Sequence, residues 1–368
     1  MRVAFFDPAR ERSELAGAVE RAISEVLDEG RFILGPQVEA FERAWAQACG
    51  ARFAVGCASG TNALSLALRA VGIGAGDEVL TAANTCVPTV AAIEDAGAVP
   101  VLVDVDETST LDPAGLPAAL TGRTRAVVPV HLYGRCADMD AVRAFAGENG
   151  LRVIEDAAQA HGAEVGGRRA GTLADAAAFS FYPTKNLGAI GDAGAIVTDD
   201  AELAERARLL RDYGQEERFR SVTRGTNSRL DTLQAAVLLA KLPSLAKRTE
   251  RRRALAARYG DALTGTGLVC PVEEPGRRHV YHLYVAQTQG RDAFRAALAK
   301  RGVETLVHYP RPIHRHPAYA GLARPGLERS ERDSGRVVSL PLYPELADDE
   351  VEHLLDAVRT VASDTVRA

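Results

Sequence analysis

The sequence predicts an α/β fold, with a mainly parallel sheet in a large domain and a smaller α+β domain after it. Strand-like and helix-like segments alternate along the first part of the chain, which is typical of a parallel sheet. Several of the strand-like segments are almost entirely apolar, as expected when helices cover both faces of the sheet. The alternation ends near residues 242–250. We therefore predict a large domain over residues 1–245 and a small domain over residues 246–368.

Two amphipathic helices are expected before the first strand. Residues 13–29 place apolar side chains on one helical face and end at Gly30, a common stop signal for a helix. A second helix begins at Pro36 and turns Phe41 and Trp45 toward the core. Both helices are interpreted as packing elements without a part in chemistry.

The alternating region contains the strands of the predicted sheet and the helices that cover it. The expected strands are at residues 52–59, 78–82, 99–103, 125–131, 151–155, 176–182 and 194–198. The expected helices are at residues 60–68, 87–97, 137–149, 201–212 and 229–241. The elements expected in the small domain are a long Arg-rich helix at 246–263, a strand at 280–286, a helix at 291–301, a loop at 308–318 and a last helix from Asp348.

The composition is that of an ordinary globular protein and excludes several classes of function. A net charge of −5 offers no basic surface to nucleic acid or to an anionic membrane. The first apolar run is too short for a signal peptide, and no stretch has the length of a membrane span. Five cysteines without CxxC pairing predict reduced thiols, neither a disulfide framework nor a zinc site. We therefore expect a cytoplasmic protein that binds neither nucleic acid nor membrane.

Lys185 is the first candidate for chemistry. Only four of the 44 Lys and Arg residues are lysines. In a chain with so strong a preference for arginine, a lysine is expected at positions whose chemistry arginine cannot perform. An arginine cannot lose its proton or form a Schiff base, whereas a buried lysine amine can do both. Lys185 follows the apolar segment 176–182 and precedes a Gly-rich loop, where an active-site lysine could be held. A solvated lysine near a strand end is the alternative.

A second candidate is the segment Ser59-Gly60-Thr61-Asn62, which joins a strand to the start of a helix. Free backbone N–H groups, the positive end of the helix dipole and two hydroxyls would suit a phosphate there. Ser180, near Lys185, could add a hydroxyl to the same phosphate. Plain helix capping is the alternative. No Walker loop or G-x-G-x-x-G motif is found, so a dinucleotide site is not expected.

The third candidate is a carboxylate at the end of a buried strand. Asp156 lies where such a group would face a ligand crevice, and it could keep a pyridinium nitrogen protonated. Gln159 follows three residues later and could reach a hydroxyl on the same ring. The alternatives are a capping role for Asp156 and a surface position for Gln159.

Together these motifs resemble the DegT/DnrJ/EryC1/StrS sugar aminotransferase family. The resemblance covers nearly the whole chain in order and spacing, and it implies a fold type I enzyme that uses pyridoxal 5'-phosphate. It also implies a homodimer whose active sites lie at the subunit interface. The motifs that carry it are Ser59-Gly-Thr-Asn-Ala-Leu64, Glu155-Asp-Ala-Ala-Gln-Ala-His161, Phe179-Ser-Phe with Thr184-Lys-Asn-Leu-Gly188, Asn227-Ser-Arg-Leu-Asp-Thr-Leu-Gln234, and His308-Tyr-Pro310 with Pro312-Ile-His314.

The resemblance implies a role for each matching residue. Lys185 would form the Schiff base and move the proton, Asp156 would pair with the pyridine nitrogen, and Gln159 would contact the phenolic oxygen. Because some relatives that act as dehydratases carry His in place of this lysine, Lys185 argues against that branch. The residues that would hold the phosphate are Gly60, Thr61, Ser180 and Asn227 of the partner subunit.

Two positions depart from the family pattern. The family usually stacks an aromatic ring on the cofactor where this chain has Cys86, so a thiol would cover the ring instead. The Gly-Gly pair of the loop after the lysine is replaced by Ala193-Gly194, which we expect to be tolerated.

Part of the chain resembles the branch of the family that acts on nucleotide-linked 3-keto-6-deoxyhexoses. The segments that carry this resemblance are Tyr281-His-Leu-Tyr284, Glu304-Thr-Leu-Val-His-Tyr-Pro310 and Pro312-Ile-His314. His316 departs from it, because that branch often has Gln at this position. Loop histidines without a catalytic role are the alternative. A metal site is not expected, because no carboxylate or Cys spacing accompanies the histidines. The residues predicted to contact substrate are Tyr182, Arg229, His308, Tyr309 and His314.

The implied reaction is a ping-pong transamination within deoxyaminosugar and antibiotic biosynthesis. L-Glutamate would donate its amino group through the cofactor, and a dTDP-3-keto-6-deoxyhexose would accept it to give an aminosugar. Three alternatives are a 4-ketosugar or ketocyclitol substrate, a desulfurase of the same fold type, and a non-catalytic regulatory homologue that binds the cofactor.

Overall fold

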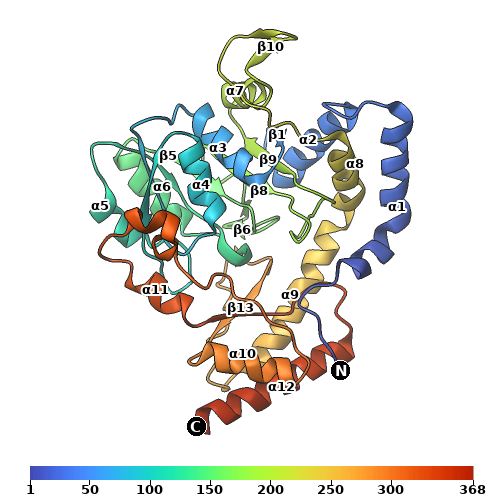
Figure 1. Ribbon diagram of the computed structural model, residues 1–368, viewed down its shortest axis with the longest axis vertical. Coiled ribbons are helices and arrows are strands. Elements are labelled where there is room, and N and C mark those ends of the chain that lie inside the picture. Colours follow the sequence, from blue (N-terminus) through green and yellow to red (C-terminus); the bar gives the residue numbers. More distant parts are fainter. Residues whose placement is uncertain (368) are drawn as a thin grey trace.

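The computed structural model describes the backbone of residues 1–367 and the side chains of residues 1–363. Its centre is a seven-stranded sheet in the order β1-β9-β8-β5-β4-β2-β3 (Figure 1). Only β9 runs against its neighbours, so the prediction of a mainly parallel sheet is confirmed. The strands are β1 (Phe53–Cys57), β2 (Glu78–Ala82), β3 (Val99–Val103), β4 (Thr124–Val128), β5 (Arg152–Asp156), β8 (Ala176–Ser180) and β9 (Gly194–Thr198).

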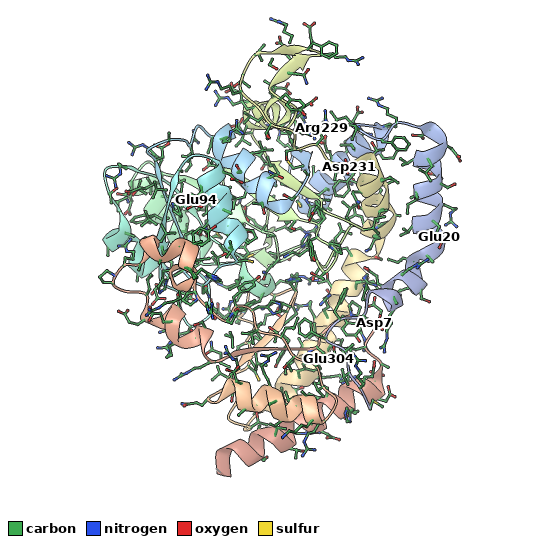
Figure 2. All side chains as sticks on the ribbon, in the orientation of Figure 1. Asp7, Glu20, Glu94, Arg229, Asp231 and Glu304 are labelled. Atoms are coloured by element: carbon green, nitrogen blue, oxygen red, sulfur yellow. The ribbon has the colours of Figure 1, made fainter. Side chains whose placement is uncertain are left out.

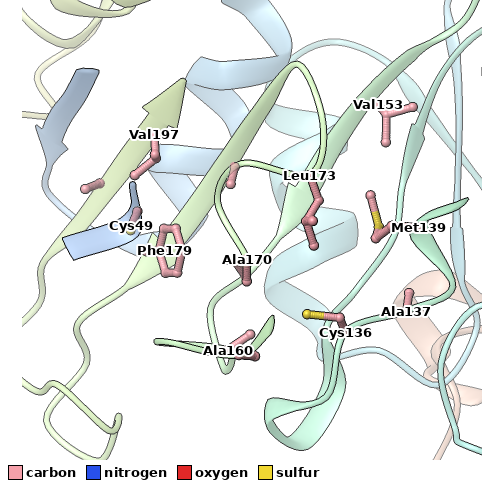
Figure 3. Close-up of a cluster of buried hydrophobic side chains, with 14 of the residues drawn as sticks. Cys49, Cys136, Ala137, Met139, Val153, Ala160, Ala170, Leu173, Phe179 and Val197 are labelled. Atoms are coloured by element: carbon pink, nitrogen blue, oxygen red, sulfur yellow. The ribbon is translucent and has the colours of Figure 1, made fainter. Parts of the chain in front are cut away.

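Helices cover both faces of this sheet, and each face has its own apolar core. Because side chains alternate along a strand, Val127 of β4 packs in one core while Ala126 and Val128 pack in the other. Figure 3 shows part of the first core, where Phe179 of β8 lies near Cys49. The helices with side chains in the first core are α2 (Pro36–Cys49), α6 (Met139–Glu148) and α8 (Thr232–Lys241). Those of the second core are α3 (Gly60–Ala70), α4 (Val87–Asp95) and α7 (Ala201–Arg211).

A third apolar core lies in the C-terminal part of the chain, and Val3 packs into it through a parallel bridge to Val303. The N-terminus therefore lies beside the C-terminal elements (Figure 1). The domain boundary at residues 245 and 246 stays a prediction. The elements around this core are α9 (Leu245–Leu263), β13 (Tyr284–Gln287), α10 (Arg291–Lys300), β14 (Val337–Leu340) and α12 (Asp348–Arg367).

Several boundaries differ from those expected. Helix α1 (Pro8–Glu29) begins five residues before 13, because Asp7 caps it by accepting from the backbone of Ala9 at 3.0 Å. Helix α8 begins three residues after 229, because the preceding segment is extended and bridges to other strands. The short elements that were not expected are α5 (Leu116–Ala119), β6 (Glu164–Val165), β7 (Arg168–Arg169), β10 (Gln215–Glu217), β11 (Arg220–Ser221), β12 (Arg277–Arg278), α11 (Glu328–Ser334) and β14.

Phe181 connects the first core to the loop that carries Lys185. Its ring is fully buried, and its centroid lies 5.2 Å from the rings of both Phe41 and Trp45. We predict that Phe181→Ala lowers the free energy of unfolding by about 3–5 kcal/mol, because the cavity left behind cannot fully collapse. Val272→Ala is the control, since Val272 is 70% exposed and its truncation should cost less than about 0.5 kcal/mol. Equal losses in urea unfolding of the two variants would contradict this prediction.

Candidate active site

A cavity of about 430 Å³ lies at the carboxyl ends of the parallel strands. Asp156 ends β5 on one wall, and Ser180 ends β8 on another. The C-terminal part of the chain closes the cavity with His282, His308 and Tyr309. Ligands of open α/β sheets bind at this edge, because the loops that leave the strands there are free to vary.

Lys185 lies on the loop after β8, with its backbone N–H bonded to the carbonyl of Tyr182 at 2.8 Å. Burial lowers the pKa of its amine, while the nearby Asp156 and Cys86 oppose that shift. Within the described part of the chain, no carboxylate lies within ion-pair distance of the amine. A buried amine of this kind can act as a nucleophile and as a base.

Asp156 is 8% exposed and is held by two donors. Its Oδ1 accepts from the N–H of Ala158 at 3.2 Å, and its Oδ2 accepts from the hydroxyl of Thr89 at 2.7 Å. The Thr89 hydroxyl also lies 2.7 Å from the hydroxyl of Thr85. Thr89 was not among the site residues predicted from the sequence. The pair Thr85 and Thr89 has helical i,i+4 spacing, but nothing in that spacing points to Asp156.

Gln159 lies between two segments that close the cavity. Its Oε1 accepts from the backbone of Tyr133 at 2.7 Å, and its Nε2 donates to the hydroxyl of Tyr309 at 3.1 Å. Burial raises the pKa of Tyr309 well above its usual value, so the phenol keeps its proton. The amide of Gln159 is therefore fixed in one orientation against the cavity.

Cys86 directly precedes α4, where its side chain makes no capping hydrogen bond, and it lines the cavity. Burial is the main cause that raises the pKa of its thiol, and the neighbouring Tyr309 hydroxyl and Lys185 oppose it. The group at this position is therefore a neutral, polarizable thiol. No aromatic ring stands there, as the sequence indicated.

The N-terminus of α3 forms another wall through Gly60 and Thr61. Ser59 does cap this helix, because its Oγ accepts from the backbone of Asn62 at 3.2 Å. A Cβ atom on Gly60 would lie 2.5 Å from the Cβ of Ser180, so only glycine lets the helix start approach β8 this closely. The free N–H groups of an 11-residue helix thus face the cavity, as an anion requires.

The other predicted residues divide into two groups. Tyr182, His308 and Tyr309 line the cavity, and burial lowers the pKa of His308 to about 4, which keeps its ring neutral. His282 also lines it and was missed, although it stands inside a motif quoted for substrate preference. Its Nδ1 lies 3.3 Å from Asn186 Oδ1.

Three predicted residues do not line the cavity of their own subunit. His314 does not reach it, because its buried ring points to Glu331 and its Nε2 lies 2.8 Å from that carboxylate. Arg229 lies beside the hairpin of β10 and β11 and pairs with Asp212 at 3.0 Å (Figure 2). Asn227 bridges to Asp212 in the same region.

Among the described residues, no group of His, Cys, Asp and Glu has the arrangement of a metal site. The described helices also include none that is long and apolar enough to cross a membrane.

Comparison with known proteins identifies the family of this chain. The profile of the DegT/DnrJ/EryC1/StrS aminotransferase family matches residues 14–359. The chain belongs to this family. The predicted family, the fold class and the aminotransferase activity are therefore confirmed.

Individual relatives extend over nearly the whole chain. The dTDP-3-amino-3,4,6-trideoxy-alpha-D-glucose transaminase of Streptomyces venezuelae is 49% identical over 97% of this chain and 96% of its own. A pleiotropic regulatory protein of Geobacillus stearothermophilus is 43% identical over 97% of this chain and 98% of its own. The crystal structure of S. venezuelae DesV in complex with a ketimine intermediate has a TM-score of 0.96 and 49% identity, and the match covers 98% of each chain.

The hydrogen bond from the Thr89 hydroxyl to Asp156 can be tested for its contribution to stability. We predict that Thr89→Val lowers the free energy of unfolding by about 1–3 kcal/mol, because the carboxylate loses a buried donor. Thr89→Ser keeps the hydroxyl and should recover most of the loss. The control is Thr264→Val, since this exposed hydroxyl bonds only back to Gly260 of its own helix. Urea unfolding of the cofactor-free proteins measures these effects, and equal stabilities of the Val and Ser variants would contradict the assignment.

Proposed function

We propose that the protein uses pyridoxal 5'-phosphate to transfer the amino group of L-glutamate to a nucleotide-linked keto-6-deoxyhexose. The substrate class that we assign is a dTDP-3-keto-6-deoxyhexose. The observation that carries the proposal is that Lys185 and Asp156 line one cavity, in a chain 49% identical to a dTDP-sugar transaminase. The product would be an aminosugar of the kind used in antibiotic biosynthesis.

The residues of the cavity fit the cofactor. Gly60, Thr61 and Ser180 would hold the phosphate at the helix N-terminus, where backbone N–H groups and the helix dipole favour an anion. Asp156 would face the ring nitrogen, and Gln159 would reach the ring hydroxyl with its Nε2 group. When bound, pyridoxal phosphate supplies an aldehyde for an amine and a ring that withdraws electrons from the bond being broken.

Lys185 would bind the cofactor and then move the proton. Its lowered pKa makes a neutral amine more accessible than in an exposed lysine, so Lys185 can accept a proton from the α-carbon of the donor. Asp156 would keep the ring nitrogen protonated by placing a fixed negative charge beside it. Thr89 and the backbone of Ala158 keep that carboxylate oriented, so that no reorganisation is needed during the reaction.

Tyr182, His308 and Tyr309 are the proposed contacts to the sugar. Tyr182 is half-exposed at the rim, whereas His308 and Tyr309 lie deeper. The neutral ring of His308 lies 2.7 Å from the hydroxyl of Ser339 through its Nδ1. These groups can donate and accept hydrogen bonds without adding charge, which suits the hydroxyls of a sugar.

A second copy of the chain would complete the site. Asn227 does not line the cavity of its own subunit, so we propose that Asn227 of the partner subunit reaches the phosphate. Arg229 would approach the substrate from the same side. The hairpin of β10 and β11 supports this assignment, since it extends from the body and carries the exposed ring of Phe219 (Figure 1).

A regulatory role without catalysis is the second candidate, because one relative with 43% identity is named a regulatory protein. The two candidates differ in whether the protein converts a ketosugar to an aminosugar. A protein that only binds the cofactor would keep Lys185 and Asp156 but would form no aminosugar, so a turnover assay with L-glutamate separates the two candidates.

The assignment predicts turnover that depends on Lys185. Cofactor-loaded protein with L-glutamate should convert a dTDP-3-keto-6-deoxyhexose to the amino product, detected by mass. The 4-keto isomer should react at least about tenfold more slowly, which corresponds to about 1.4 kcal/mol in the transition state. Lys185→Arg should be inactive, because a guanidinium cannot form the Schiff base. Product formation by Lys185→Arg, or a preference for the 4-keto isomer, would overturn the corresponding part of the proposal.

The shared site predicts complementation between two inactive subunits. Lys185→Ala should be inactive, and Asn227→Ala should bind the cofactor about 10- to 100-fold more weakly, because a bond to a charged group is lost. Mixed dimers would contain one site with both residues intact. At limiting cofactor, random mixing should therefore restore about a quarter of the wild-type activity. No recovery after verified subunit exchange would show that Asn227 acts within its own subunit.

A further inference from the structure

A second cavity of about 380 Å³ adjoins the active-site cavity, and the function described above gives it no role. The two cavities share a wall formed by Thr184, His282, Leu283 and His308. Thr184 directly precedes Lys185 in the chain. Residues next to the proposed reacting amine therefore line both cavities.

The walls of this cavity are mainly apolar, and one cation lines it. Phe5, Leu306, Leu340 and Leu342 contribute apolar surface. Arg252 of α9 also lines the cavity and is only 4% exposed. Burying a guanidinium among apolar groups is costly unless its charge is balanced.

Arg252 has no carboxylate partner within ion-pair distance in the described part of the chain. Its Nη1 donates to the carbonyls of Leu342 at 2.7 Å, Tyr281 at 3.3 Å and His282 at 3.4 Å. These bonds engage one of its three nitrogens and leave the positive charge unpaired. Burial and the repulsion of Arg248 lower the pKa of Arg252 to about 10, and the carboxylates of Glu345 and Glu11, which pair with Arg248, oppose this shift only in part.

Arg248 lies one turn away from Arg252 on α9 and, unlike Arg252, is paired with carboxylates. Its partners are Glu11 at 3.2 Å, Glu14 at 3.3 Å and Glu345 at 2.5 Å. Three carboxylates thus surround Arg248, whereas within the described part of the chain the guanidinium beside the second cavity has none at ion-pair distance.

Among the described residues, Glu304 is the one carboxylate that lines the second cavity, and it is already paired. Glu304 accepts from Arg2 at 2.6 and 2.9 Å and from the backbone of Phe5 at 3.2 Å. Figure 2 shows Glu304 in the lower part of the molecule, below Asp7. The remaining ionisable groups of the wall, His282 and His308, are kept neutral because burial lowers their pKa values. None of these wall residues therefore supplies a free negative charge to Arg252.

We propose that this cavity is a subsite for a small carboxylate, and that it takes the side-chain carboxylate of the amino donor, an assignment that rests on the proposed function. A carboxylate with a short apolar chain matches a cavity with one guanidinium and apolar walls. Its place beside Thr184 would let one dicarboxylic amino acid reach both Arg252 and the amine of Lys185.

The test is calorimetric binding of glutarate to cofactor-loaded protein. Glutarate has two carboxylates but neither an amino nor a keto group, so it cannot react. Arg252→Met should weaken its binding about 10- to 100-fold, the effect of losing a bond to a charged group. Arg251→Gln is the matched control, because Arg251 lies next in the chain and pairs with Asp348 instead. The neutral diamide glutaramide should bind equally weakly to all variants.

Arg252→Met also removes a donor from three carbonyls and can destabilise the fold. A second variant, Leu306→Trp, therefore fills the cavity without touching Arg252. Leu306 is 44% exposed, and its bond to Ser339 uses only backbone atoms. Its control is Val272→Trp, at a position that is 70% exposed and does not line the cavity. Equal glutarate affinity of wild type and Leu306→Trp would overturn the subsite.

Kinetics identify the source of the carboxylate. If the subsite takes the donor, Leu306→Trp raises the KM for L-glutamate about tenfold, while the KM for the ketosugar stays within about twofold. Glutarate then also competes with L-glutamate in the wild-type protein. Glutarate binding that needs Arg252 but leaves the KM for L-glutamate unchanged supports a carboxylate subsite and overturns the donor assignment. Failure of the proposed function is a separate outcome: wild-type protein would produce no aminosugar, whereas its glutarate binding would still depend on Arg252.

Discussion

The buried carboxylate of Glu155 is the interaction on which the site depends. It is fully buried, and it accepts from Gly171 and His131 at 2.9 Å and from Leu173 at 2.8 Å. A buried charge must be fully bonded to be tolerated, so the segment of Gly171 and Leu173 and the segment of His131 are held around the end of β5. Because side chains alternate along a strand, the next residue, Asp156, then faces the opposite side and enters the cavity. The position of Asp156, the carboxylate proposed to act in catalysis, thus depends on the bonds of its structural neighbour Glu155.

Cations of this protein follow two different patterns. Arg248 and Lys241 are buried with carboxylate partners, and they fasten α9 and α8 to helix α1. Lys185 is partly buried and Arg252 is buried; within the described part of the chain neither has such a partner at ion-pair distance, and each lines a cavity. A cation whose charge the fold does not balance favours an anionic or electron-poor ligand, which is why we assign chemistry to Lys185 and recognition to Arg252.

Local patterns predicted the sheet and most helices well, because apolar strands and amphipathic helices have distinct periods. They were wrong where distant segments decide the conformation. Residues 229–231 were expected to be helical, but Arg229 bridges to Cys57 and Asp231 to Ile33, which keeps the backbone extended. Strand β14 was not expected, since its pairing with β13 joins segments about fifty residues apart.

By itself, the sequence determined the family, the fold class and the candidates Lys185, Asp156 and Gln159, because these depend on motifs of neighbouring residues. Only the tertiary structure decided which side chains meet. It joined Thr89 to Asp156, bonded Gln159 to Tyr309, and turned His314 away from the cavity toward Glu331. It also left Arg252 without a counter-ion. The physical reason is that hydrogen bonds and charge balance depend on distances between segments, and spacing along the chain does not encode those distances.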